Sequence, residues 1–217
     1  MNKRSSPHTA VSAAVIAGGA NRRMGRPKGL LEIEGVPLIT RVADALSRIS
    51  DDTICVTCRP EEYRFEAHRL RFVPDYGELP QGPLSGIMGA LAHARCAVCI
   101  VVAVDMPFLN PALLRHLADQ AAGADVVLPV IESDRPEPLH AVYRTTCLPF
   151  GVAALEAGHR KVTSFFNNVT VRRVMGTELR TYDPELASFA NVNTPREFAR
   201  AMAALNQTGS RVASVPQ

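Results

Sequence analysis

Apolar runs and amphipathic segments alternate along the chain, and this alternation predicts strands separated by helices. A short apolar run over 12–17 ends at glycines, which is typical of a buried parallel strand followed by a loop. The segments 37–49 and 83–94 each repeat apolar residues at helical spacing. The most apolar run, 97–104, predicts the central strand. Further strands are predicted over 53–57, 71–73, 126–130 and 169–175.

Helix signals fall between these strands. A short helix is predicted over 61–68, and Asn110 with Pro111 predicts the capped start of another. Thr194 and Glu197 form a capping-box pattern that predicts a last helix ending near Leu205. Strand, loop and helix in repetition predict an α/β fold, a single-domain doubly wound, mostly parallel sheet with helices on both faces. Such sheets bind ligands at the carboxyl ends of their strands.

The length of 217 residues suits one hydrophobic core. We expect an N-terminal tail over 1–10, one domain over 11–205 and a polar tail over 206–217. The N-terminus resembles a signal peptide, but its apolar run is short and ends in Gly18-Gly19, so a buried first strand explains it better. No segment has the length of a transmembrane helix, so we expect a soluble, cytoplasmic protein with no membrane partner.

Composition narrows the class of partner. Apolar residues make up 47% and charged residues 21%, as in soluble globular proteins. The net charge of +3 comes from scattered basic residues, which does not favour nucleic acid as a partner.

The cysteines include two C-x-x-C pairs, Cys55 with Cys58 and Cys96 with Cys99. Two such pairs can form a zinc site. Each pair lies in or beside a predicted strand, where residues three apart point to opposite faces, so we expect buried structural thiols rather than zinc. The fifth, Cys147, leaves an odd number, which disfavours a disulfide framework and fits a reducing compartment.

A basic, glycine-rich loop follows the first predicted strand and is a candidate phosphate site. It contains Gly18, Gly19, Arg23 and Lys28, whose backbone amides and positive charges suit phosphate oxygens. It matches neither the Walker loop nor the G-x-G-x-x-G fingerprint. A glycine turn with solvated basic residues is the alternative.

Two aspartates follow other predicted strands. Asp105 comes directly after the central strand, where a carboxylate could hold Mg²⁺ against phosphate, or could merely cap the turn. Asp75 precedes the Gly82-Pro83 turn and is either a polar contact for a ribose or base or a turn residue. His140 and His159 have no evident partners, and we expect structural or solvated roles for both.

Five motifs in order resemble those of the molybdenum cofactor guanylyltransferases, within the wider nucleotidyltransferase superfamily. They are A-G-G-x-x-x-R-M-G-x-x-K-x-L-L (17–31), G-P-L-S-G (82–86), D-M-P-F (105–108), P-L-H-A-V-Y (138–143) and N-V-N-T-P (191–195). The resemblance runs through nearly the whole chain and implies a Rossmann-like nucleotidyltransferase fold. It implies transfer of GMP from GTP to the terminal phosphate of molybdopterin, with Mg²⁺ as cofactor and release of pyrophosphate.

The resemblance also implies roles by position. Catalytic roles go to Arg23, Lys28 and Asp105, with Asp105 the metal ligand. Acceptor-side roles go to Asn191 and Asn193. The implied nucleotide-binding residues are Ile16, Ala17, Gly18, Gly19, Lys28, Asp75, Gly82, Pro83 and Asp105.

Alternatives remain open at this point. Cys58 precedes Arg59 where relatives often carry asparagine, which bears on the choice of guanine over another base. The chain could transfer CMP to molybdopterin, or a nucleotide to another phosphorylated metabolite. From another class, it could be a non-catalytic carrier or insertion partner of the cofactor. Transient contact with molybdoenzymes or their chaperones is a further expectation.

Overall fold

The computed structural model describes residues 9–18, 27–66, 68–77, 82–132, 134–194, 196–197 and 199–200. Its main sheet has seven strands in the order β5-β4-β1-β6-β8-β7-β9. The strands are β1 (Val11–Ile16), β4 (Asp52–Val56), β5 (Arg71–Val73), β6 (Val98–Ala103), β7 (Val126–Val130), β8 (His140–Arg144) and β9 (Val171–Met175). A separate two-stranded hairpin pairs β2 (Glu32–Ile33) with β3 (Val36–Pro37).

Six strands of this sheet run parallel, and β8 alone is antiparallel to both of its neighbours. The strand order reverses beside β1, since β4 and β5 extend the sheet to one side and β6 extends it to the other. The predicted doubly wound, mostly parallel sheet is therefore confirmed. Its topological switch point lies between the carboxyl ends of β1 and β6.

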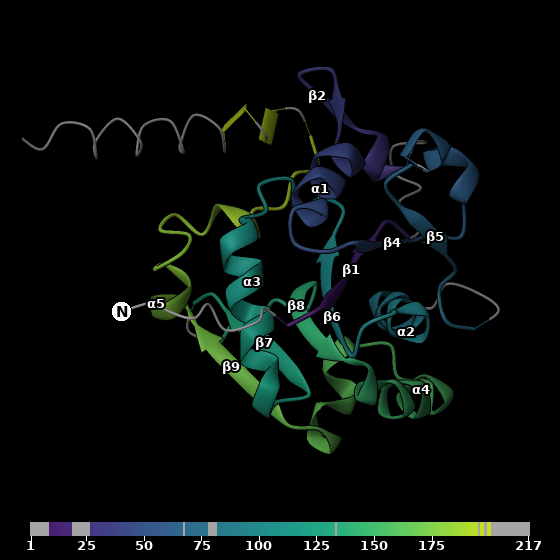
Figure 1. Ribbon diagram of the computed structural model, residues 1–217, viewed down its shortest axis with the longest axis vertical. Helices are drawn as coiled ribbons and strands as arrows, with labels where there is room; N and C mark the ends of the chain where they lie inside the picture. Colours follow the sequence, from purple (N-terminus) through teal and green to yellow (C-terminus); the bar gives the residue numbers. More distant parts are fainter. Residues whose placement is uncertain are drawn as a thin grey trace, which may run out of the picture.

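Helices cover both faces of the sheet (Figure 1). One core cluster joins α1 (Leu38–Ser47) and α3 (Pro111–Asp119) to one face, and another joins α2 (Pro83–His93) and α4 (Leu148–Glu156) to the other. A short α5 (Gly176–Leu179) follows β9. Among the described residues no helix is both long and apolar enough to cross a bilayer.

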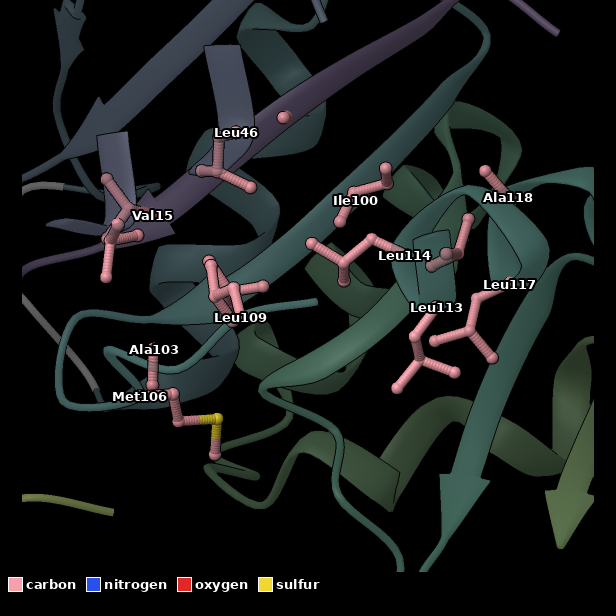
Figure 2. Close-up of a cluster of buried hydrophobic side chains, with 14 of the residues drawn as sticks. Val15, Leu46, Ile100, Ala103, Met106, Leu109, Leu113, Leu114, Leu117 and Ala118 are labelled. Carbon is pink, nitrogen blue, oxygen red and sulfur yellow. The ribbon is translucent and has the colours of Figure 1, made fainter. Parts of the chain in front are cut away.

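The central strand β6 shows why its sequence is apolar throughout. Val98, Ile100 and Val102 pack on the α1 and α3 side, whereas Cys99 and Val101 pack on the α2 and α4 side. A strand buried on both faces needs apolar residues at every position rather than at alternate ones. Figure 2 shows part of the first cluster, with Ile100 of β6 near Leu113, Leu114 and Leu117 of α3.

Helix starts agree closely with the capping signals. Asn110 Oδ1 accepts hydrogen bonds from the N–H groups of Ala112 (2.9 Å) and Leu113 (3.2 Å), so the predicted cap of α3 is confirmed. Thr194 Oγ1 likewise accepts from the Glu197 N–H at 3.2 Å. Residues 196, 197, 199 and 200 are helical, and Leu205 lies outside the described residues.

Several details differ from the sequence-based expectations. The segment Pro60–Glu66 is a 3₁₀ helix with non-helical dihedral angles at Tyr63. Neither β8 nor α4 is anticipated by the local pattern. The thiols of Cys55, Cys99 and Cys147 are buried as expected, whereas Cys58 is exposed and Cys96 is half-buried.

Candidate active site

The carboxyl end of β1 continues into a glycine that a neighbouring carboxylate approaches closely. The Ala17 N–H donates to Val56 O at 3.0 Å, which extends the pairing of β1 with β4 by one residue. A Cβ atom at Gly18 would lie 3.2 Å from Asp75 Oδ2. The absence of a side chain at Gly18 therefore leaves room for this carboxylate. Ile16, Ala17 and Gly18 lie where predicted, and Gly19 and Arg23 lie outside the described residues.

Asp75 is buried with one oxygen unpaired. Ser85 Oγ donates to its Oδ1 at 3.2 Å, and its Oδ2 has no hydrogen-bond partner among the described residues. Burial raises the pKa of Asp75, although the Ser85 hydroxyl partly offsets this. A buried acceptor without a donor is unfavourable in a protein interior, so it indicates a position where a ligand could donate.

The G-P-L-S-G motif places α2 against this carboxylate. Gly82 has a positive φ of 92°, and Pro83 opens the helix directly after it. Ser85, one turn on, lies 2.8 Å from Gly82 O as well as 3.2 Å from Asp75. A Cβ at Gly89 would come within 2.4 Å of Pro74 O, so this glycine permits the close contact between the helix and the Asp75 loop.

Lys28 and Asp105 form an ion pair at the switch point. Lys28 Nζ lies 2.5 Å from Asp105 Oδ2, and the two side chains are 24% and 16% exposed. Lys28 opens a 3₁₀ turn, Lys28–Leu30, while Asp105 lies two residues beyond β6. These residues are 77 apart in sequence. Their contact confirms that the fold brings the basic loop and the strand-ending carboxylate together.

The late N-V-N motif is attached to the backbone of Asp105. The Val192 N–H donates to Asp105 O at 2.8 Å, and the Val192 side chain is buried against Ile33 and Leu38. Asn191 and Asn193 flank this residue and are both exposed. The backbone of this motif therefore lies beside Asp105, and the acceptor-side role of Asn191 and Asn193 stays a prediction.

A second carboxylate at this edge was missed by the sequence analysis. The antiparallel register pairs Val102 with His140, and the Ala103 N–H donates to Leu139 O at 2.8 Å. The turn before β8 leads back to Glu137, whose N–H donates to Pro129 O at 2.9 Å. Burial raises the pKa of Glu137, and the negative charge of Asp105 adds to the effect. Its position directly before the P-L-H-A-V-Y motif is the only local signal that could have found it.

The carboxylates at this edge of the sheet could bind a divalent cation only if a bound substrate supplied further oxygen ligands. In the described part of the chain, no group of three or more His, Cys, Asp or Glu side chains could hold a metal ion. Magnesium is commonly held by one or two carboxylates, with water and substrate phosphates completing its shell. Asp105 fits that pattern as the carboxylate, with water and substrate phosphates as the remaining ligands.

This site combines a doubly wound sheet, a lysine from the first loop and a carboxylate after the central strand, which suits the binding of phosphate and a divalent cation. A family model for the MobA-like NTP transferase domain matches residues 13–173, and the chain belongs to this family. It is an enzyme of the nucleotidyltransferase class.

Individual relatives show which members of this family the chain is similar to. A probable molybdenum cofactor guanylyltransferase of Pelotomaculum thermopropionicum is 39% identical over 91% of this chain and 96% of the relative. The molybdenum cofactor guanylyltransferase of Desulfosudis oleivorans is 32% identical over 90% of this chain and 96% of its own length. A crystal structure of molybdopterin-guanine dinucleotide biosynthesis protein A from Archaeoglobus fulgidus superimposes with a TM-score of 0.76 at 32% identity, covering 90% of this chain and 99% of the other.

Proposed function

We propose that this enzyme transfers GMP from GTP to the terminal phosphate of molybdopterin and releases pyrophosphate. The observation that carries the proposal is the Lys28–Asp105 pair at the switch point. Gly18, at the end of β1, lies against another carboxylate, that of Asp75. Molybdenum cofactor guanylyltransferases of the same family, aligned over nearly the whole chain, supply the substrate class.

The reaction needs positioning and charge rather than a protein nucleophile. An oxygen of the acceptor phosphate attacks the α-phosphorus of GTP, and the bond from the α-phosphorus to the bridging oxygen of the β-phosphate breaks. The leaving pyrophosphate carries that electron pair away, so the chain need not form a covalent intermediate. Since a phosphate monoester is already ionised near neutral pH, no side-chain base is required.

Lys28 and Arg23 are assigned to the charge on the triphosphate, and Asp105 to Mg²⁺. A bound Mg²⁺ would neutralise developing negative charge on the phosphate oxygens. Asn191 and Asn193 are assigned to the acceptor side, because the Val192 N–H ties their segment to Asp105. Their amides can donate to phosphate oxygens without adding charge.

Asp75 is assigned to the nucleoside, together with the other residues that the family resemblance implies for nucleotide binding: Ile16, Ala17, Gly18, Gly19, Gly82 and Pro83. Its unpaired Oδ2 can accept an N–H or O–H from the ligand. Guanine offers two adjacent donors, its N1–H and its 2-amino group, which match the two oxygens of a carboxylate. Cytosine presents an unprotonated N3 where guanine has N1–H, so a carboxylate here favours guanine.

Calorimetric binding of GTP, CTP and ATP in the presence of Mg²⁺ tests the proposal. We expect GTP to bind most tightly and to yield the dinucleotide when molybdopterin is added. A preference for CTP would assign the chain to cytidylyl transfer, and binding of no triphosphate would favour a non-catalytic carrier. Asp75→Asn serves as the matched variant, because it retains the size of the side chain and removes its charge.

The same proposal sets the cellular context. We infer a reducing, cytoplasmic setting from the free cysteines. Transient contact with molybdoenzymes or their chaperones would deliver the product, and cross-linking in cell extract, followed by identification of the captured protein, tests it.

A further inference from the structure

The ion pair between Lys28 and Asp105 occupies the carboxylate that the proposed reaction assigns to the metal. The lysine nitrogen lies 2.5 Å from Asp105 Oδ2, and both side chains are largely shielded from water. Shielding makes such a pair stronger than an exposed surface pair, since solvent screens it less. A cation approaching Asp105 therefore competes with an ammonium group already in place.

Packing beneath the lysine fixes its backbone. A Cβ atom at Gly29 would lie 2.9 Å from the Tyr63 ring and 3.0 Å from Val104 Cγ2. Gly29 thus sits in direct contact with the residue before Asp105, with no side chain of its own between them. The Leu31 N–H donates to Lys28 O at 3.1 Å, which closes the short turn. The ion pair is consequently supported by the fold rather than by two flexible side chains alone.

The carboxylate side is equally constrained. Asp105 O accepts from the Val192 N–H at 2.8 Å, and the Met106 N–H donates to Ala103 O at 3.3 Å. Glu137, three residues before β8, is close enough for the negative charge of Asp105 to contribute to raising its pKa. The positive charge of Lys28 offsets the charge of Asp105 for as long as the ion pair persists.

We infer that Lys28 acts as a latch on Asp105, which a nucleoside triphosphate opens by drawing the lysine onto its phosphates. This inference rests on the proposed function and adds a regulation of the same site. In the free protein the latch lowers the affinity of Asp105 for a divalent cation. When the triphosphate withdraws Lys28, Asp105 becomes available, so nucleotide and metal bind cooperatively.

Thermodynamic linkage makes the coupling reciprocal. If Asp105 restrains Lys28 in the free protein, then the triphosphate must also break this pair in order to bind. Removal of the Lys28 charge should strengthen the binding of a divalent cation to Asp105. Removal of the Asp105 charge should strengthen the binding of the triphosphate to Lys28. This reciprocity separates a latch from two residues that act independently.

Binding of Mn²⁺ to the nucleotide-free protein, followed by the electron paramagnetic resonance signal of the free ion, is the first test. Lys28→Met should bind Mn²⁺ about tenfold more tightly than the unaltered protein. Lys28→Arg keeps the positive charge and should bind as weakly as the unaltered protein. Arg59→Gln removes one charge from the same edge of the sheet, where Arg59 pairs with Glu62 instead, and should leave the affinity unchanged.

Two results in this first test would overturn the inference. One is equal Mn²⁺ affinity in Lys28→Met and the unaltered protein, while Asp105→Asn abolishes binding. The other is undiminished Mn²⁺ binding in Asp105→Asn, which would place the ion elsewhere. Circular dichroism and thermal unfolding of each variant verify that the fold is intact.

The second test is a cycle of GTP affinities measured in excess chelator, without metal. Asp105→Asn should bind GTP about tenfold more tightly, because Lys28 is then free. In the Lys28→Met background the same change should give no such gain. If the gain persists there, it reflects repulsion between Asp105 and phosphate, and the latch is refuted. If no variant binds GTP, even with Mg²⁺ present, the proposed function is refuted instead. The Mn²⁺ test uses nucleotide-free protein and does not depend on GTP binding.

Discussion

The main sheet carries one buried aspartate at the amino ends of its parallel strands, here called the amino edge, and one at their carboxyl ends, the carboxyl edge. The surroundings of these two aspartates differ. At the amino edge, Asp52 begins β4 and accepts from Ser12 Oγ at 2.5 Å, from Arg71 Nη2 at 2.7 Å and from the Arg95 N–H at 3.0 Å. At the carboxyl edge, Asp75 accepts one hydrogen bond and leaves Oδ2 without a partner among the described residues.

The pKa directions record this difference. Burial alone would raise the pKa of Asp52, but the hydrogen bonds from Ser12 and Arg71 and the charge of Arg71 outweigh it, so the pKa is lowered. For Asp75, burial dominates and the pKa is raised. One edge satisfies its polar groups internally and holds the strands together, while the other leaves them for a ligand. Substitutions should therefore affect stability at the amino edge and activity at the carboxyl edge.

The largest effect should come from Asp105→Ala. Loss of this carboxylate removes the assigned metal ligand, and we expect kcat/KM to fall on the order of a thousandfold. The thermal midpoint should change far less than the activity, because the substitution removes a single ion pair whose lysine keeps some contact with solvent. Pyrophosphate release measures the first quantity and calorimetric unfolding the second. Retained activity with normal Mg²⁺ dependence would remove Asp105 from the mechanism.

At the opposite edge, Asp52→Ala should reverse this outcome. It leaves Ser12, Arg71 and the Arg95 N–H without their shared acceptor, and should lower the free energy of unfolding by about 3 kcal/mol. Urea titration measures this loss, and kcat/KM at 25 °C should stay within about twofold. The exposed neighbour Asp51→Ala is the matched control and should leave the urea midpoint unchanged. An equal loss in both variants would mean that the network contributes nothing specific.

Asp75→Asn sharpens the comparison, because it should weaken function and spare stability. We expect about a tenfold loss of GTP affinity, since one acceptor for the nucleoside is removed. The variant should be at least as stable as the parent at pH 7, because it no longer buries an unpaired charge. A raised pKa means that the parent protein gains stability as the pH falls through the pKa of Asp75 in the folded state. The advantage of the variant should therefore shrink toward about pH 4, as urea titrations at both pH values would show.

Much of the fold could be predicted from the sequence because its signals are local. The boundaries of β5 and β7 and the cap at Asn110 follow from short apolar runs and turn residues. The same holds for Lys28 and Asp105, since the switch point of a doubly wound sheet brings the two loops together.

The strand β8 could not be predicted in this way, because its position depends on distant partners. It inserts between β6 and β7 and runs against both, so its place is decided by pairing rather than by its own pattern. Glu137 was missed for this reason, since the pairing of β8 with β6 brings the turn before His140 to this end of the sheet. The buried network of Asp52 was missed as well, because it joins residues from four strand starts.

His140 is an exception at the carboxyl edge, because its ring lacks a hydrogen-bond partner among the described residues but is buried where a ligand cannot reach it. It begins β8 at the carboxyl edge, but its ring is fully buried and packs on Phe189 with centroids 4.4 Å apart. Neither ring nitrogen has a hydrogen-bond partner among the described residues. Burial lowers the pKa of His140 to about 3, against a smaller opposing influence from the nearby Ser188 backbone.

This depressed pKa predicts an acid-sensitive fold. The unfolded chain takes up the proton near the ordinary histidine pKa of about 6.5, whereas the folded protein resists it, so stability falls as the pH drops below that value. The loss between pH 8 and pH 5.5 should be about 1 kcal/mol. His140→Phe removes the titrating group and should abolish this part of the slope, while Asp75 and Glu137 contribute equally to both proteins and cancel. Urea titrations of the two proteins across this range measure the difference, and kcat/KM should be unchanged at pH 8. A parallel slope in both proteins would show that His140 is protonated in the folded state, and a large loss of activity would mean that an unpaired group at this edge serves the ligand even when it faces the core.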